Sequence, residues 1–307
     1  MIKAVIIADS ISAHTNQRIT TFELEYPRFI HAELMTHRQF SRNSASSRAI
    51  PIDKMIEQVE NNTAYPIHWG RNQSGMQAKR EVPNKIDAAS AWQMAALSAV
   101  DSARDLQSLG LHKQIVNRVL EPFQMMKVLV TATNFDNFFN LRCHADAQPE
   151  IKHLADLMYQ AMQNSIPEVL HAGEWHTPYV EHQPDDNGNT LYYILKEGSS
   201  GWMVEEYLTL EDALKVSCSC AAQVSYRKND TSIEKALAIY DKLVNSDPVH
   251  ASAFEHCATP INPYGMDAQL VGAITHSNDY AQYSGNFEDW IQYRQLIPNH
   301  DCKEFRK

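Results

Sequence analysis

The sequence lacks any apolar run long enough to cross a membrane, and it lacks a secretory signal. Its first ten residues, MIKAVIIADS, contain only a short apolar run that ends at Asp9. Repeats and a flexible interdomain linker are also absent. We therefore expect a cytoplasmic protein that makes no membrane contacts and folds as a single domain.

Cysteine is scarce as well: the chain has five, an odd number, and no CxxC pair. This pattern is typical of reduced thiols in a cytoplasmic protein and argues against a disulfide framework. Cys218 and Cys220 fall in a predicted helix, where positions two apart face different directions. We therefore expect one of these thiols to be buried and the other to have no particular role.

A recognisable set of metal ligands is also missing. The residues that come nearest to one are spaced irregularly and interrupted by Pro178, which does not fit a helical HExxH arrangement. They are His171, Glu174, His176 and His182. We therefore predict hydrogen-bonded histidines here and no metal site.

Basic residues are not in excess: 27 Lys and Arg stand against 37 Asp and Glu, a formal net charge of −10. This argues against binding to a nucleic-acid polymer or to an anionic membrane. Basic residues do gather locally, in the stretch 35–51, MTHRQFSRNSASSRAIP. Forked arginine donors, serine hydroxyls and backbone N–H groups together suit a phosphate or carboxylate, so we interpret this stretch as a loop that binds a small anion. A solvated loop without a ligand is the alternative.

The hydrophobic pattern predicts several strands. Alternating residues predict strands at 3–11 and 18–25. The turn residues 185–189 predict a hairpin within 179–197. Residues 123–133 fit either a buried strand or the end of a helix.

Helical periodicity is equally clear. It predicts helices at 86–109, 113–120, 136–142, 149–162, 209–223 and 233–244. Gly110 is placed to end the first, and Thr231 with Glu234 forms a capping box for the last. Residues 53–82 are polar and predict loops with one short helix. The fold class is therefore α+β, with a mixed sheet and packed helices.

The stretch 35–51 resembles the signature of the flavin-dependent thymidylate synthases, in which Arg-His-Arg is followed by spaced Ser, Asn, Glu, Ser and Arg. The matching positions are His37, Arg38, Ser41, Asn43, Ser46 and Arg48. Four positions depart from the signature: Thr36 replaces the first arginine, Ser44 the glutamate, Ser47 the glycine and Ala49 the aromatic residue.

Three further segments resemble the same family. Residues 112–155 are similar to its long C-terminal part, 222–226 (AQVSY) to ARVSY, and 250–256 (HASAFEH) to HxSPFEH. In the family the last two segments precede the signature, whereas here they follow it. The resemblance therefore implies a circularly permuted chain, with one catalytic domain over 1–307 and an inserted hairpin at about 165–205.

The resemblance implies an activity: C5 methylation of dUMP to dTMP, with methylenetetrahydrofolate as carbon donor and FAD reduced by NADPH. It also implies a homotetramer with sites between subunits. The cofactor carries the redox chemistry, and no cysteine nucleophile is needed.

The same match implies roles for individual residues. Ser46, Ser47, Arg48 and Arg118 would hold the phosphate and sugar. Arg142 would contact the pyrimidine and act in catalysis, together with Ser44 at the position of the family's glutamate. Glu33, where glutamine is usual, would also contact the substrate. The implied flavin contacts are His37, Arg38, Asn43, Thr131, Thr133, Ser225, Ser252 and Glu255.

Two alternatives remain open. Glu33 can accept a hydrogen bond from a cytosine amino group, which suggests a relative acting on dCMP, or one that adds hydroxymethyl. The losses at Thr36 and Ser44 would also fit a protein that binds nucleotide or flavin without catalysis.

Overall fold

The computed structural model describes residues 1–197, 202–226, 230–262 and 282–304. Its centre is a five-stranded sheet with the order β3-β4-β2-β1-β5, in which only β1 and β5 run parallel. The strands are β1 (Lys3–Ser12), β2 (Arg18–Pro27), β3 (Ser41–Ser44), β4 (Met125–Ala132) and β5 (Glu168–Leu170). The predicted α+β class with a mixed sheet is confirmed.

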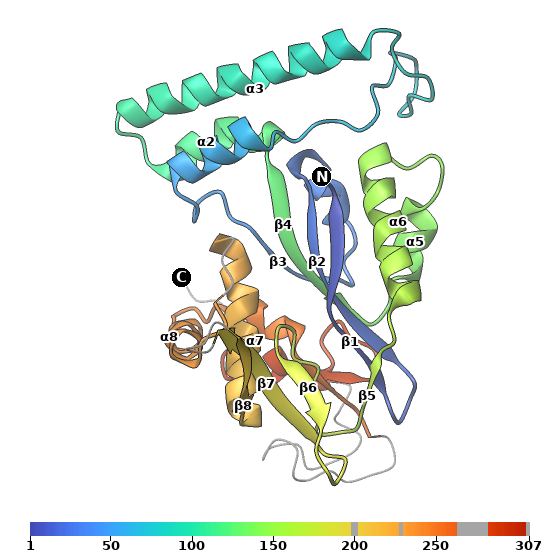
Figure 1. The fold of residues 1–307 in the computed structure, drawn as a ribbon, viewed down its shortest axis with the longest axis vertical. Coiled ribbons are helices and arrows are strands. Elements are labelled where there is room, and N and C mark those ends of the chain that lie inside the picture. The colour runs from blue at the N-terminus through green and yellow to red at the C-terminus, as the bar shows by residue number, and fades with distance from the viewer. Residues whose placement is uncertain (198–201, 227–229, 263–281, 305–307) are drawn as a thin grey trace.

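One face of this sheet is covered by α5 (Asp136–Arg142) and α6 (Pro149–Asn164), on the right in Figure 1. Phe22, Leu24 and Tyr26 alternate along β2 and are fully buried in the core on this face. Helix α6 presents Ile151 and Leu154 to the same core. The apolar residues that alternate along the strand therefore pack against the apolar stripe of the helix in one core.

A helical layer lies at the top of Figure 1, beside the ends of β3 and β4. It consists of α2 (Ile52–Asn61), α3 (Lys85–Ser108), α4 (Lys113–Val116) and the 3-10 helix η2 (Asn117–Phe123). Gly110 has a φ of +79°, which confirms it as the residue that ends α3. The helix expected over 113–120 changes to 3-10 geometry after Val116, and this 3-10 stretch contains Pro122, which has no N–H to donate.

The chain after β5 builds the lower half of the molecule and covers the other face of the sheet. Its elements are β6 (Glu181–Pro184), β7 (Thr190–Glu197), β8 (Met203–Leu208), α7 (Leu210–Gln223), η3 (Val224–Tyr226), α8 (Ile233–Val244), η4 (Ala251–His256), β9 (Ala258–Pro260), β10 (Trp290–Gln292) and η6 (Tyr293–Leu296). The predicted hairpin is confirmed as β6 and β7, and β8 extends it to a three-stranded sheet.

Three expectations were wrong in detail. The stretch 35–51 is not loop throughout, because β3 pairs with the edge of β4. Cys220 is as buried as Cys218, since both face neighbours packed on α7. Ser232, not Thr231, is the N-cap of α8, and no side chain caps it. Across the described ranges, no helix is both long and apolar enough to span a bilayer.

Candidate functional site

A polar cavity of about 180 Å³ lies where β3 ends and β4 begins. The stretch 35–51 enters it because Ala45 N donates to Lys127 O, which continues the β3–β4 ladder, and the chain then turns, with Ala49 N bonded to Ser46 O. All five residues that the signature placed near the phosphate or the catalytic glutamate line this cavity: Ser44, Ser46, Ser47, Arg48 and Arg118. Arg28 and His31 line it as well, from η1 (Arg28–Ile30) and α1 (His31–Leu34).

Glu121 holds the charged wall of the cavity in place. Its Oε1 accepts hydrogen bonds from Ser47 Oγ at 3.0 Å and Arg118 Nη1 at 2.8 Å. Arg28 Nη2 lies 2.9 Å from the same oxygen. Arg48 adds a third guanidinium to this wall. Three arginines against one carboxylate leave excess positive charge, which suits a phosphate group.

His31, which lines this cavity, is hydrogen-bonded to Tyr26 on strand β2. Tyr26 OH lies 2.8 Å from His31 Nδ1. Burial, with Arg28 and Arg42 nearby, lowers the pKa of His31 to about 4, so the ring is neutral at neutral pH. Arg42 donates to the backbone oxygens of Met35 and His37, at 3.0 and 3.2 Å. His31, which lines the cavity, is therefore neutral, and Arg42 reaches the backbone around His37.

Arg142, at the end of α5, forms the second centre of the site. Its Nε donates to His37 Nε2 at 3.0 Å, and its Nη1 and Nη2 lie 3.3 Å from Glu33 Oε2 and Thr36 Oγ1. Burial, helped by Arg142 and Arg42, lowers the pKa of His37 to about 4. His37 is therefore a neutral acceptor that orients the guanidinium without opposing its charge.

Glu33 is the unusual member of this group. Its burial raises the pKa of the carboxyl group, Arg142 lowers it, and the nearby Glu150 raises it again. The net shift is upward, so the neutral form of Glu33 is more populated than for an exposed glutamate. The structure thus brings together the two residues that the sequence placed against the pyrimidine.

The implied flavin contacts do not converge in the same way. Asn43 Nδ2 donates to Ala221 O at 3.1 Å, on the face of β3 opposite Arg42. Thr131 is fully buried and bonds Thr21 and His256. These groups are occupied by hydrogen bonds within the chain.

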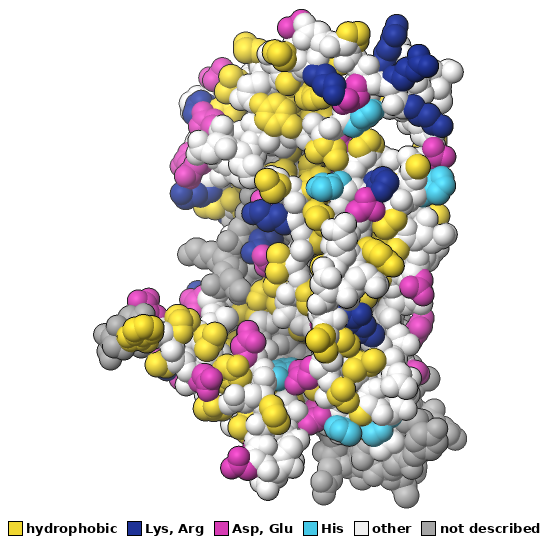
Figure 2. Space-filling model, turned by 45° about the vertical axis from the view of Figure 1, so that its right-hand side comes forward, with side chains coloured by type: hydrophobic (Ala, Val, Ile, Leu, Met, Phe, Trp, Pro, Cys, Tyr) yellow, Lys and Arg dark blue, Asp and Glu magenta, His cyan; other side chains and the backbone are white. Residues whose placement is uncertain are grey.

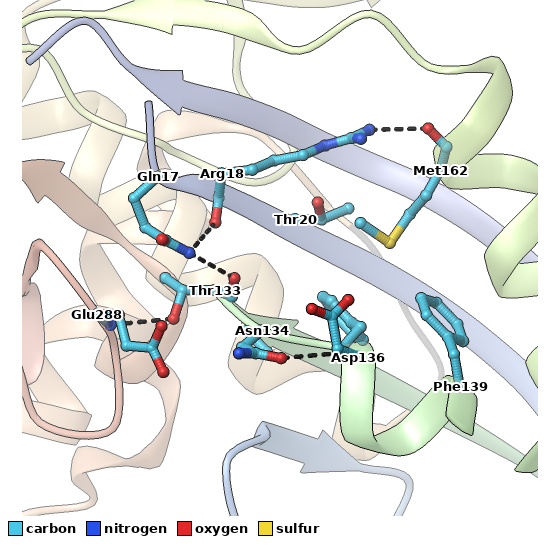
Figure 3. Close-up of a pocket in the computed structure, with 11 residues that line it drawn as sticks. Gln17, Arg18, Thr20, Thr133, Asn134, Asp136, Phe139, Met162 and Glu288 are labelled. Carbon is cyan, nitrogen blue, oxygen red and sulfur yellow. Dashed lines mark hydrogen bonds between the residues drawn. The ribbon is translucent and has the colours of Figure 1, made fainter. Parts of the chain in front are cut away.

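Two further predicted contacts are also engaged. Glu255 pairs with Arg294. Thr133 accepts from Glu288 N at 3.0 Å and lines a separate cavity of about 270 Å³ at the far end of β2 and β4 (Figure 3). Asn134 and Asp136 line the same cavity. Eight residues of β2 separate the two cavities, roughly 26 Å at about 3.3 Å per residue.

Donors suited to a flavin do remain in other places. Arg38 and Ser252 are exposed, and Ser225 is half-buried. Asn43, Thr131, Thr133 and Glu255 are already bonded, however, and of the predicted flavin residues only Thr133 lines either of the two cavities described above. The described residues fit a nucleotide phosphate and a base, and they fit a flavin only in part.

The segments near Ser225 and Gln292 nevertheless lie against the signature, as a circularly permuted order would place them. Ser46 N donates to Ser225 O at 3.1 Å. Gln292 Nε2 lies 3.3 Å from both Ser41 Oγ and Glu255 O. Segments that are about 180 residues or more apart in sequence therefore share one side of β3.

The histidines considered as metal ligands serve other contacts. His176 bonds Ser10 Oγ and Thr21 Oγ1, at 2.9 and 2.8 Å. His182 bonds Thr177 and Glu168. Over the described part of the chain, no three His, Cys, Asp or Glu side chains gather as a metal site would require.

Sequence reasoning missed three residues of the phosphate cavity: Arg28, His31 and Glu121. Glu121 had a signal, because it lies three residues after Arg118, where a helical turn allows an ion pair. Arg28 and His31 had none, since only the folded β2 brings them beside Ser46.

The fold and the site together define an α+β protein with a polar cavity lined by three arginines and, at the end of α5, a further arginine held by His37, Glu33 and Thr36. A family model described as thymidylate synthase complementing protein matches residues 6–168, just over half of the chain. The chain belongs to this family of flavin-dependent thymidylate synthase-like methyltransferases. Among curated protein sequences, none matches.

Solved structures resemble it in part. The UMP/dUMP methylase PolB from Streptomyces cacaoi, bound with 5-Br dUMP, aligns with a TM-score of 0.44 at 16% identity, covering 53% of this chain and 90% of that one. Thymidylate Synthase X from Helicobacter pylori, with FAD and dUMP, aligns with a TM-score of 0.36 at 16% identity, covering 47% of this chain and 67% of that one.

Proposed function

We propose that the protein methylates dUMP at C5 to give dTMP, with methylenetetrahydrofolate as the carbon donor and NADPH-reduced FAD as cofactor. The observation that carries this proposal is the cavity lined by five residues to which the resemblance gives a role: Ser44, Ser46, Ser47, Arg48 and Arg118. Family membership supports the class of reaction. The substrate and both co-substrates belong to the proposal.

The chain's own residues have separate tasks in this proposal. The phosphate cavity holds the nucleotide by its charged end, with Arg48 and Arg118 as donors. Arg142 contacts the pyrimidine, where its positive charge stabilises the ring as electron density moves towards C5. Neutral His37 fixes the guanidinium, so this stabilisation is preorganised before substrate arrives.

We infer that residues of a second copy of the chain complete the flavin-binding site. Arg38 and Ser252 are exposed, Ser225 is half-buried, and the other predicted contacts are engaged within one chain, so additional groups are needed. This supports a homo-oligomer, a tetramer by analogy with the family, and we expect it in the cytoplasm. Sedimentation of the FAD-loaded protein as a monomer at micromolar concentration would contradict it.

A second candidate is methylation of dCMP. Glu33 carries an ionisable carboxyl group beside Arg142, where it can accept from the cytosine amino group when charged. The two substrates differ at C4, which carries a carbonyl oxygen in uracil and an amino group in cytosine, and at N3, which is protonated only in uracil. Direct competition between dUMP and dCMP therefore separates the two candidates.

The test begins with the visible absorption spectrum of the purified protein, with FAD added if needed. Titration with dUMP should perturb the flavin band, and incubation with methylenetetrahydrofolate and NADPH should give dTMP. A spectral response and product from dCMP alone would establish the second candidate. Binding of nucleotide without NADPH oxidation would instead identify a non-catalytic relative.

A further inference from the structure

The loop between α2 and α3 is unusually basic for this acidic protein. Between His68 and Lys85 it has one acidic residue, Glu81, and four basic ones: Arg71, Lys79, Arg80 and Lys85. Figure 2 shows Lys and Arg side chains gathered at the upper right, on the side where Figure 1 draws this loop. None of these residues has a role in the site described above.

The loop has a defined shape. Arg71 N donates to Arg80 O at 2.6 Å, and Val82 N donates to Trp69 O at 2.8 Å. Gly70 allows this close approach, because a Cβ at its position would lie 2.4 Å from Ala78 Cβ. Arg71 and Arg80 are therefore held on facing sides of a narrow hairpin.

Two of the loop's four positive charges have acidic partners, and the other two have none among the described residues. Lys85 pairs with Glu81, and Lys79 Nζ lies 3.9 Å from Asp146. Arg71 and Arg80 are exposed, and within the described residues neither guanidinium has an ion-pair or hydrogen-bond partner. Two adjacent forked donors suit a ligand with more than one carboxylate.

The loop is anchored at the pyrimidine end of the site. Ile67 N donates to Glu150 Oε1 at 2.8 Å, and Glu150 is close enough to Glu33 to raise its pKa. Asp146, the partner of Lys79, follows Arg142 by four residues. A ligand that reaches the base and extends outward would therefore pass this loop.

We propose that Arg71 and Arg80 bind the chain of γ-linked glutamates carried by a folate co-substrate. This inference rests on the proposed function. The folate must bring its one-carbon group to C5 of the base, so its glutamate tail leaves the site on the pyrimidine side. A net charge of −10 repels such a polyanion, and the two arginines supply the local positive field that offsets this repulsion.

The test is calorimetric titration of the dUMP-saturated protein with folate monoglutamate and folate pentaglutamate. We expect the pentaglutamate to bind about tenfold more tightly, with an advantage that shrinks as salt rises. The double variant R71A/R80A should lose this advantage and keep the affinity for the monoglutamate. The matched control K235A/K242A removes two exposed charges from α8, in the opposite half of the molecule, and should keep it.

Equal affinity for the two folates, or an advantage that survives in R71A/R80A, overturns the inference alone, because dUMP binding and turnover are then intact. Failure of both folates to bind overturns it together with the folate part of the proposed function. Equally tight binding of a single-stranded oligonucleotide at Arg71 and Arg80 would replace it with a nucleic-acid surface.

Discussion

At the scale of single residues, the charged wall of the phosphate cavity depends on Arg118. Among the residues that the structure describes, its guanidinium bonds Glu121, and Arg118 lines the cavity. We expect R118A to weaken dUMP binding by about tenfold, the usual cost of one charge-assisted hydrogen bond at a half-exposed site.

Deoxyuridine, which lacks the phosphate, is the matched ligand for this test. Calorimetry should show its affinity unchanged by R118A. An equal loss for both ligands would mean that Arg118 contacts the sugar or the base, not the phosphate.

Glu33 makes base preference depend on pH. Burial raises the pKa of Glu33, so as the pH falls its neutral form appears at a higher pH than for an exposed glutamate. This neutral form can donate to the uracil O4. Raising the pH through this pKa ionises the group, which can then only accept, as a cytosine amino group requires. The ratio of dCMP to dUMP affinity should therefore rise with pH.

The variant E33Q removes this titration. It should bind both bases with a ratio independent of pH over the weakly acidic to neutral range, as followed by competition binding. A pH-dependent ratio that persists in E33Q would assign the effect to another group.

At the scale of elements, a buried polar chain joins the two halves. It runs from Ser10 on β1 through His176, Thr21 and Thr131 to His256 on η4, with successive contacts of 2.7–2.9 Å. All five residues are almost fully buried. Low dielectric surroundings strengthen such bonds and make an unpaired member costly.

The substitution T131V breaks this chain while keeping the shape of the side chain. We expect a loss of about 1–3 kcal/mol in the free energy of unfolding, because His256 Nδ1 and Thr21 lose a partner inside the core. Urea unfolding measures it. T190V, which removes a half-buried bond to Glu174, is the control and should cost less.

At the scale of the whole molecule, we propose that residues 1–307 form a single folding unit. The family match ends at residue 168, but the sheet face that carries Leu129 and Thr131 is covered by segments beyond it. Ile19 likewise packs on Trp290. A fragment ending at residue 168 leaves this face in water.

We therefore expect fragment 1–168 to lose fixed tertiary packing, seen as loss of the near-ultraviolet circular dichroism of its buried aromatic residues. The full chain is the reference. A fragment that unfolds cooperatively, with a native-like spectrum, would divide the chain into two domains and contradict the proposal.

Much of the fold follows from local pattern. Helix α3 ends at Gly110, the hairpin turns at Asp185, and Thr209 caps α7 by accepting from Asp212 N at 3.1 Å. Short-range hydrogen bonds and side-chain periodicity fix these features, so the sequence alone determines them. The sequence also determined the family, because His37, Arg38, Ser41, Asn43, Ser46 and Arg48 keep the spacing of its signature.

Only the tertiary structure decided how the remaining groups are used. Arg28 lines the cavity and Glu121 bonds its wall, whereas Asn43 and Thr131 bond elsewhere, through contacts between segments 74 to 178 residues apart. Such contacts depend on which face of β3 and β4 each half of the chain covers. The sequence pattern predicts that successive side chains of a strand point to opposite faces of the sheet. Which residues each side chain contacts there depends on how the two halves of the chain pack together.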